Sequence, residues 1–249
     1  MHIRCGRATD VGMVRKENQD ALGMLPEGAT TLADPRGVLF IVADGMGGHR
    51  AGRRASELAV ATIMSAFSPV DADGIPAALS SALIEANRRV FDEGSSTPAY
   101  NGMGTTCTAL AVQGNSAWIA HVGDSKIFRI TSDGIAQITT DHSRVWELYA
   151  RGIITREQAR VHPERNLLTR ALGQLPEISA DLSGPLPLQP GVRFVLCTDG
   201  LTNHVEESEV KEIVLRSPPE AAASELVALA NTRGGSDNIT VQIVEVLGG

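Results

Sequence analysis

The segment "VLFIVADGMGGHRAG" (residues 38–52) places a carboxylate and four glycines directly after an apolar run. The run at 38–43 does not alternate between apolar and polar residues, so it predicts a strand that is buried on both faces. A charge at the end of such a strand is unfavourable unless a partner satisfies it. Three interpretations of Asp44 compete: a phosphate or dinucleotide cradle, a tight turn in which the acid caps a helix, and a metal ion.

The dinucleotide interpretation fits the glycine spacing poorly. The GxGxxG fingerprint begins correctly with Gly45 and Gly47, but Arg50 occupies its sixth position. Asp44 would also face the pyrophosphate with a charge of the same sign. A capping turn stays open when this stretch is considered alone.

The same pattern of an acid at a strand end recurs along the chain. Four further cases are Asp20 in "ENQDALGM", Asp124 in "HVGDS", Asp199 in "VLCTDG" and Asp237 in "GGSDNITV". Together with Asp44 they indicate carboxylates that converge at one end of a sheet, where they repel one another unless a cation lies between them. Oxygen ligands without cysteines or clustered histidines favour a hard ion, Mg²⁺ or Mn²⁺.

The composition limits the classes of protein that need to be considered. The 249 residues are 43% hydrophobic and 20% charged, which is enough apolar material for a full core, and no Pro-, Gly- or Ser-rich linker divides them. We therefore expect one domain over residues 1–249. A net charge of −7 argues against a nucleic-acid partner, because phosphate backbones need a basic face.

Cysteine usage and the N-terminal residues indicate an intracellular protein. Cys5, Cys107 and Cys197 lie far apart and form no CxxC pair, so neither a zinc site nor a disulfide framework is expected. The first residues lack an apolar signal region, and the longest wholly apolar run, at 38–43, is too short to span a bilayer. We expect a cytoplasmic protein with no membrane partner.

Hydrophobic periodicity predicts strands and helices without a βαβ alternation. Apolar residues recur at helical spacing over 51–63 and 78–90, and two further helices are expected at 206–215 and 219–231. Apolar runs predict strands at 1–10, 20–25, 37–43, 105–112, 116–122, 125–130, 134–139, 192–200 and 238–246. This order indicates an α+β fold.

Eight segments, in order along the chain, resemble the motifs of the metal-dependent PP2C-type protein phosphatases, in particular the bacterial single-domain ones. They are "RKENQD", "ADGMGGH", "GMGTTCTAL", "HVGDSK", "TTDHS", "NLLTRALG", "CTDGL" and "GGSDNITV". The resemblance extends from about residue 4 to residue 246. It implies the family's fold, a four-layer α-β-β-α sandwich in which two antiparallel sheets are flanked by helix pairs.

The resemblance also implies how the acids would hold metal ions. Asp44 would bridge two ions, and the carbonyl of Gly45 would bind one of them. Asp199 and Asp237 would hold the first ion, and Asp20 would serve the second directly or through water. The two ions, Mn²⁺ or Mg²⁺, would share a hydroxide that attacks phosphorus in line, without a covalent enzyme intermediate.

Two further residues complete the implied site. Asp124 would help to hold a third, weaker ion, and Arg15 would grip the substrate phosphate with its planar guanidinium. Arg15, Asp44 and Asp199 are the expected catalytic residues. The implied activity is hydrolysis of phosphoserine and phosphothreonine on proteins, by a monomer that opposes a Ser/Thr kinase.

Several positions depart from patterns common in eukaryotic members of the family. Gln19 stands where a metal-binding glutamate is found, and Met46 stands where a histidine has been proposed as general acid. Asn203 stands where a third-metal carboxylate often lies. His49 is a candidate substitute for the general acid, although a histidine at a helix start is more often a surface residue.

Residues 141–173 differ in character from the rest of the chain. They hold six arginines and four acids, a local surplus of positive charge in an acidic protein. A short helix is expected from about Asp141 to before Gly152, and Thr155 with Gln158 has capping-box spacing for a second. The segment is either a solvated helical face or, as the resemblance implies, a flap that receives phosphoprotein.

Two other functions remain open. The chain could be a catalytically weak phosphoprotein-binding regulator that keeps its metal site for shape, although the intact set of acids argues against this. It could also hydrolyse small phosphate esters. The absence of an "HCxxxxxR" segment and of a second acid two residues after Asp44 excludes the thiol and aspartyl-phosphate mechanisms.

Overall fold

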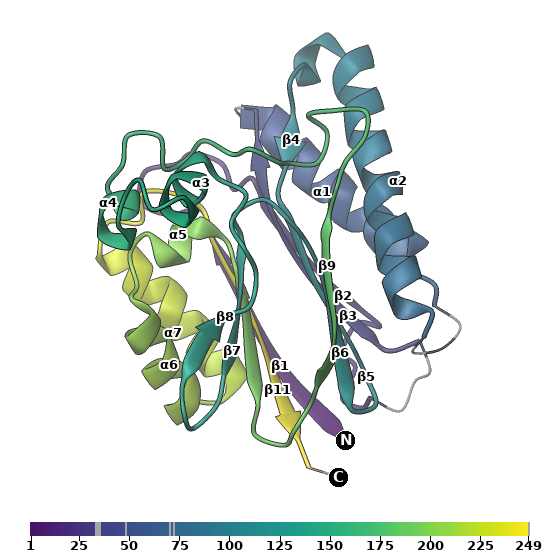
Figure 1. The fold of residues 1–249 in the computed structure, drawn as a ribbon, viewed down its shortest axis with the longest axis vertical. Helices are drawn as coiled ribbons and strands as arrows, with labels where there is room; N and C mark the ends of the chain where they lie inside the picture. Colours follow the sequence, from purple (N-terminus) through teal and green to yellow (C-terminus); the bar gives the residue numbers. More distant parts are fainter. Residues whose placement is uncertain (33–35, 48, 70, 72, 249) are drawn as a thin grey trace.

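The computed structural model describes residues 1–32, 36–47, 49–69, 71 and 73–248. Its strands form two antiparallel sheets that lie face to face, with a helical layer on each outer side (Figure 1). The predicted α+β class and four-layer α-β-β-α sandwich are thus confirmed.

The first sheet has five strands in the order β1-β11-β10-β7-β8. These strands are β1 (His2–Asp10), β7 (Lys126–Ile130), β8 (Ile135–Gln137), β10 (Arg193–Cys197) and β11 (Ile239–Leu247). The second sheet has six strands in the order β2-β3-β5-β6-β9, and the short β4 pairs with β3. These strands are β2 (Asp20–Leu25), β3 (Val38–Met46), β4 (Gly104–Thr105), β5 (Cys107–Gln113), β6 (Ser116–Val122) and β9 (Asp181–Pro187).

The position of β3 between two hydrophobic cores explains why its sequence is apolar without alternation. Leu39, Ile41 and Ala43 point into the core between the second sheet and its helices. Val38, Phe40 and Val42 point the other way, into the core between the two sheets. Side chains alternate across a strand, so a strand between two cores needs apolar residues at every position.

Each outer face of the sandwich is covered by helices that bury one apolar stripe. Figure 1 shows the two N-terminal helices on the second sheet and the C-terminal helices on the first sheet. A third core of apolar side chains lies between the first sheet and its helices. The long helices are α1 (His49–Ala66), α2 (Ile75–Ser96), α6 (Glu207–Arg216) and α7 (Pro219–Thr232). Two of the short helices are the 3₁₀ helix η1 (Pro98–Tyr100) and the α-helix α5 (Asp199–Thr202).

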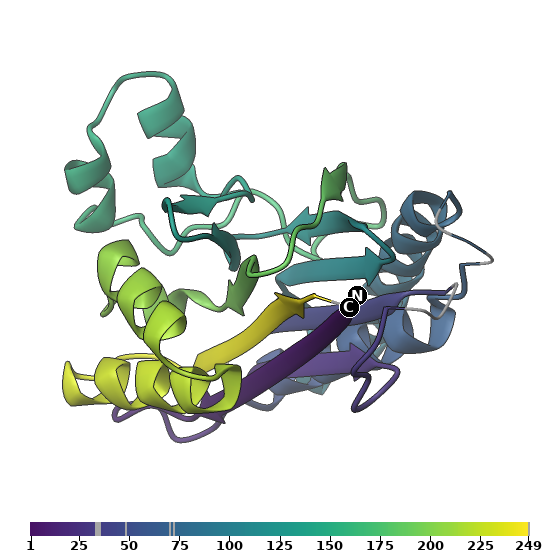
Figure 2. The same cartoon turned by 90° about the horizontal axis from the view of Figure 1, so that it is seen from below.

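The chain termini and the strand-end acids lie at opposite ends of the sandwich. The chain termini lie together at one end, because β1 and β11 pair in antiparallel fashion with His2 opposite Leu247 (Figure 2). At the other end of this pair, Asp10 lies opposite Ile239, two residues after Asp237. The strand-end acids therefore gather at the end that is remote from the termini.

The segment from 141 to 173 contains two short helices, α3 (Arg144–Ala150) and α4 (Arg156–Arg160). Helix α3 begins three residues later than expected because the side chain of Ser143 caps it. Helix α4 begins with the predicted capping box of Thr155 and Gln158. We call residues 141–173 the flap.

Strand β9 was not predicted from the sequence. It is an exposed strand at the edge of the second sheet that contains Gly184 and Pro185 and pairs with β6. Most residues of this strand are exposed, so it lacks the apolar alternation on which the prediction relied. None of the helices in the described ranges combines the length and apolar character that crossing a bilayer needs.

Candidate active site

Asp20 and Asp44 face each other across neighbouring strands. Asp20 begins β2, Asp44 lies near the end of β3, and the antiparallel register pairs the two residues directly. Burial raises the pKa of Asp44 well above its usual range, and repulsion from Asp20, Asp199, Asp124 and Asp237 adds to the effect. The structure therefore brings the five strand-end acids together into one cluster, which we call the carboxylate cluster.

Two buried threonines fix the backbone of Asp44. Its N–H donates to the Oγ1 of Thr106 at 2.8 Å. Its carbonyl oxygen accepts from the Oγ1 of Thr105 and from the N–H of Thr106, both at 2.9 Å. Both the N–H and the carbonyl of Asp44 are therefore hydrogen-bonded inside the protein, which fixes the backbone that carries its carboxylate.

Two carboxylate oxygens of the cluster are buried without a hydrogen-bond partner. The hydroxyl of Thr198 donates to Asp20 Oδ2 at 2.9 Å, and the amide of Asn203 donates to Asp199 Oδ2 at 3.2 Å. The remaining oxygens, Asp20 Oδ1 and Asp199 Oδ1, have no partner among the described residues. An unpaired buried carboxylate oxygen is unfavourable, and a cation satisfies it.

The cluster is short of positive charge. Burial raises the pKa of Asp20 to about 7, with the hydroxyls of Thr240 and Thr198 opposing this and Asp199 adding repulsion. Burial also raises the pKa of Asp199, and Asp237 is the first of the charges that add to it. A free aspartate ionises near pH 4, so these groups need either protons or cations at neutral pH.

Arg15 is in direct contact with the cluster. Its Nη2 donates to Asp237 Oδ2 at 2.7 Å, which raises the pKa of the guanidinium. The other oxygen of Asp237 accepts from the N–H of Asn238 at 2.9 Å. The Arg15 side chain is 52% exposed, so part of its guanidinium faces solvent beside the acids.

Asp124 lies in the loop between β6 and β7, next to Asp199. Burial raises its pKa to about 7, with Asp199 adding repulsion and Lys126 opposing it. Asp124 and Asp199 line both a cavity of about 220 Å³ over the cluster and a larger one of about 450 Å³ beneath the flap. Asp124 therefore marks the boundary between the two cavities.

Most of the residues that the sequence singled out line the smaller cavity, but Asp20 does not. The walls of this cavity are formed by Arg15, Gln19, Asp44, Gly45, Met46, Gly47, Thr106, Asp124, Asn166, Leu168, Asp199 and Asp237. Asn203 lines the larger cavity instead. The side chain of His49 lies outside the described residues.

The glycines after Asp44 allow two backbones to approach each other. A Cβ atom on Gly45 would lie 2.1 Å from the carbonyl oxygen of Gly52, and one on Gly52 would lie 2.7 Å from the carbonyl oxygen of Gly45. The end of β3 thus packs directly on the first turns of α1. Close packing of β3 on α1, rather than a phosphate cradle, explains these two glycines.

The cluster has suitable donors for a hard ion but not a finished coordination sphere. In the described part of the chain, no three His, Cys, Asp or Glu side chains are arranged so that they could hold an ion as they stand. Thr198, Asn203 and Arg15 each hold one oxygen of an acid in a hydrogen bond. All-oxygen donors, two of them buried and unpaired, fit a hard ion such as Mn²⁺ or Mg²⁺.

Sequence reasoning missed the side chain that ties the cluster together. Asn238 is 4% exposed. Its Oδ1 accepts from the N–H of Gln19 at 2.8 Å, and its Nδ2 donates to the carbonyls of Val11 and Glu17 at 2.9 and 3.0 Å. It therefore holds the segment that carries Arg15 and Asp20. The only sequence signal was its place beside Asp237 in "GGSDNITV".

Comparisons with known proteins identify the family to which this fold belongs. Residues 14–237 match the family model described as protein phosphatase 2C. The chain is 39% identical over 241 residues to the protein phosphatase PhpP of Streptococcus pneumoniae, covering 96% of this chain and 95% of that protein. It is 38% identical to the serine/threonine phosphatase stp of Listeria monocytogenes, covering 95% of this chain and 93% of that protein.

Solved structures show the same similarity. The serine/threonine phosphatase PstP/Ppp of Mycobacterium tuberculosis superposes with a TM-score of 0.89 at 31% identity, covering 100% of both chains. The catalytic domain of PstP in complex with two manganese ions superposes with a TM-score of 0.87 at 31% identity, covering 99% of both chains. Fold and similarity together define a protein phosphatase. The chain belongs to the protein phosphatase 2C family, and its activity is that of a serine/threonine phosphatase.

Proposed function

We propose that the chain hydrolyses phosphoserine and phosphothreonine on proteins with two divalent metal ions held by the carboxylate cluster. Asp20, Asp44, Asp199 and Asp237 supply the carboxylates, and Gly45 supplies a carbonyl. The observation that carries the proposal is the pair of unpaired buried oxygens, Asp20 Oδ1 and Asp199 Oδ1, in a cluster of repelling acids. The manganese complex of the similar PstP domain supports the choice of ion.

Divalent ions bound here would supply Lewis acidity and lower the pKa of a water molecule toward neutrality. The chain's own residues then orient the phosphate for direct attack by water. Arg15 binds the phosphoryl oxygens with charge-assisted hydrogen bonds and stabilises the negative charge that develops on them. Met46 cannot donate a proton, so the leaving serine or threonine oxygen takes its proton from water.

Asp124 is proposed to help hold a third, weaker ion. Asn203 contributes an amide where an acid would add charge, and affinity for hard cations follows ligand charge. The third ion is therefore held less tightly than the other two. We expect this ion at the boundary between the two cavities, because Asp124 and Asp199 line both of them.

The larger cavity supports a polypeptide substrate. It lies between the flap and helices α5 and α6, and shares Asp124, Asn166 and Asp199 with the cavity over the cluster. Trp146 of the flap lines it beside Tyr149, with ring centroids 5.2 Å apart. Such a groove suits the chain on either side of a phosphorylated residue better than a small ester. The partners we propose are phosphoproteins made by a Ser/Thr kinase, and the acting unit is a monomer.

The test compares a phosphothreonine peptide with p-nitrophenyl phosphate as substrates. Both should be hydrolysed in Mn²⁺, neither in excess chelator, and activity should return when Mn²⁺ is added back. Full turnover in chelator would overturn the metal mechanism. Peptide binding without turnover of either substrate would favour a phosphoprotein-binding regulator. A kcat/KM that is higher for simple esters than for every phosphopeptide would favour a small-ester phosphatase.

A further inference from the structure

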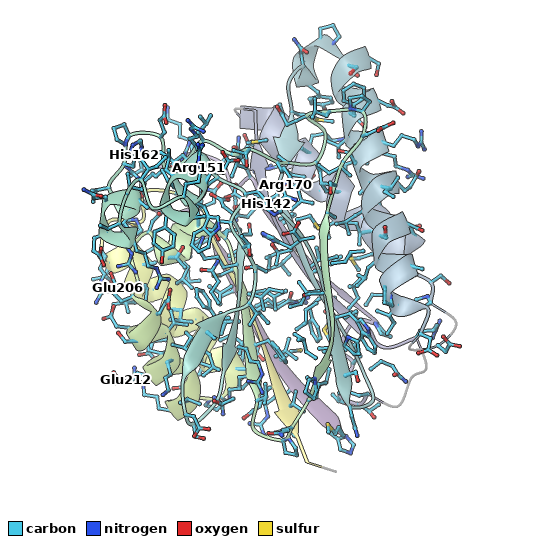
Figure 3. All side chains as sticks on the ribbon, viewed as in Figure 1. His142, Arg151, His162, Arg170, Glu206 and Glu212 are labelled. Atoms are coloured by element: carbon cyan, nitrogen blue, oxygen red, sulfur yellow. The ribbon has the colours of Figure 1, made fainter. Side chains whose placement is uncertain are left out.

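His142 joins the flap to the loop that carries Asp124. The residue is 2% exposed and lies at the base of the flap (Figure 3). Its backbone N–H donates to the carbonyl oxygen of Gly123 at 2.7 Å, and its own carbonyl oxygen accepts from the N–H of Thr169 at 2.8 Å. It is therefore bonded both to the residue before Asp124 and to the returning arm of the flap.

The imidazole adds a second bond to the same loop. The N–H of Gly123 lies 3.0 Å from Nδ1 of His142. An N–H group can only donate, so Nδ1 accepts, and the ring proton is carried by Nε2. Nε2 lies 3.1 Å from Asp181 Oδ2, and Asp181 also accepts from Arg170 at 2.8 Å. Burial lowers the pKa of His142, which favours the neutral ring that this arrangement requires.

The loop is held from its other side as well. Lys126 Nζ donates to the carbonyl oxygen of Asp124 at 2.8 Å and to Asp141 Oδ2 at 2.7 Å. Gly123 has a φ of +109°, and a Cβ there would lie 2.5 Å from the Cγ2 of Thr106. The loop therefore follows a path that only glycine adopts easily, and both peptide groups of Gly123 depend on His142.

We propose that His142 is a positioning residue that sets the direction of the Asp124 carboxylate. The ring and the backbone of His142 hold the N–H and C=O of Gly123, and Asp124 is the next residue. A weak ion site depends strongly on how its few ligands are aimed, because no surplus ligand compensates for a misplaced one. This inference rests on the proposed role of Asp124 in holding the third ion.

Two substitutions of His142 each preserve one hydrogen bond of the imidazole and remove the other. In His142→Asn the amide oxygen can take the place of Nδ1 and accept from Gly123. In His142→Gln the amide can take the place of Nε2 and reach Asp181, but it leaves the N–H of Gly123 without a partner. Control substitution His162→Gln removes a similar contact in the flap, because the Nδ1 of His162 accepts from the N–H of Glu164 at 3.1 Å. Figure 3 shows His162 on the outer part of the flap, away from His142.

The first readout is amide hydrogen exchange in the metal-free protein. His142→Gln should speed exchange at Gly123 about tenfold or more, because one buried hydrogen bond is lost, and leave distant core amides unchanged. The second readout is calorimetric titration with Mn²⁺. The weakest binding event should lose about tenfold in affinity or more, while the two tight events stay. With p-nitrophenyl phosphate, kcat should fall and KM should change little. His142→Asn and His162→Gln should resemble the unaltered chain.

The outcomes distinguish this inference from the function on which it rests. If Asp124→Ala leaves both the weak ion and kcat unchanged, the proposed role of Asp124 is wrong. If Asp124→Ala acts as proposed while His142→Gln matches the unaltered chain, the positioning role is wrong. Should His142→Gln fail to fold, nitrogen NMR of the unaltered metal-free chain tests the same bond. The ring of His142 must carry its proton on Nε2, with Nδ1 as the acceptor from Gly123. A proton on Nδ1 would exclude that bond and overturn the inference.

Discussion

Arg15 lies beside the carboxylates that we propose to bind metal ions, and we propose that it also binds the substrate phosphate. It is bonded to Asp237 at 2.7 Å and keeps half of its side chain exposed. Its pKa is raised by that bond, so it is a permanent cation under all conditions of assay. A cation in this position attracts the phosphate without contributing a ligand to the metal ions.

Arg15→Ala should therefore weaken phosphate binding more than metal binding. A charge-assisted contact is worth roughly 1.5–3 kcal/mol, which is about a 10- to 150-fold change in the inhibition constant of inorganic phosphate. The two tight Mn²⁺ binding events should persist in calorimetry. Arg7→Ala is the matched control, because Arg7 forms an exposed ion pair with Glu27 and does not line the cavity over the cluster. Unchanged phosphate inhibition would exclude the assigned role.

Removing one acid from the cluster should lower the activity but raise the stability of the metal-free protein. Asp44→Asn and Asp199→Asn should each lower kcat by several orders of magnitude, because loss of a metal-activated water raises the barrier by several kcal/mol. The metal-free variants should nevertheless melt at a higher temperature than the metal-free parent, because mutual repulsion is relieved. Activity within tenfold of the parent, or a lower melting temperature, would contradict this.

At the scale of elements, the strand β3 and the helix α1 are joined by two backbones in contact. Gly45 and Gly52 leave no space for a side chain between the strand end and the helix. The N–H of Gly45 also donates to the carbonyl oxygen of Gln19 at 3.1 Å. The position of Asp44 therefore depends on a tight junction of three segments rather than on its own loop.

Gly45→Ala should loosen that junction. The added methyl group would overlap the carbonyl oxygen of Gly52, and overpacking of this kind destabilises proteins by typically 1–3 kcal/mol. We expect a lower denaturation midpoint together with weaker Mn²⁺ binding. Gly134→Ala is the control, since nothing lies within 4 Å of a Cβ at that position. Equal stability of the two variants would show that the junction tolerates a side chain.

At the scale of the whole molecule, the metal-free protein contains buried acids that resist ionisation. Burial raises the pKa values of Asp20 and Asp124 to about 7. In the unfolded chain both ionise near pH 4, so the folded state binds more protons between these values. Stability linked to these groups is present below pH 4 and is lost as the pH rises through about 7.

Metal-free protein should therefore become less stable between pH 5 and pH 8. Each of these groups contributes a slope of at most about 1.4 kcal/mol per pH unit. Denaturant unfolding in chelator at the two pH values measures the change. Saturating Mn²⁺ should remove or reverse the trend, because the ions bind the ionised carboxylates of the folded state. Stability of the metal-free protein that rises with pH would contradict the raised pKa values of these two acids.

Local sequence determined the features that depend on nearest neighbours. The unbroken apolar run of β3, the helical periodicity of α1 and α2, and the capping box of α4 each satisfy local backbone and burial requirements. Acids at strand ends pointed to a metal site for the same reason, since a charge beside a buried strand needs a partner. The family resemblance then supplied roles for individual acids that spacing alone did not give.

Tertiary structure alone decided which of these residues meet. The register of β2 on β3 sets Asp20 opposite Asp44, and the side chain of Asn238 holds a segment more than 200 residues away. Strand β9 depends on the free edge of β6, with which it pairs, since its own residues are mostly exposed. The bond from His142 to Gly123 spans 19 residues and follows from how the flap returns to the sheet. Such contacts leave no periodic signal in a sequence, because they depend on packing between distant segments rather than on local propensity.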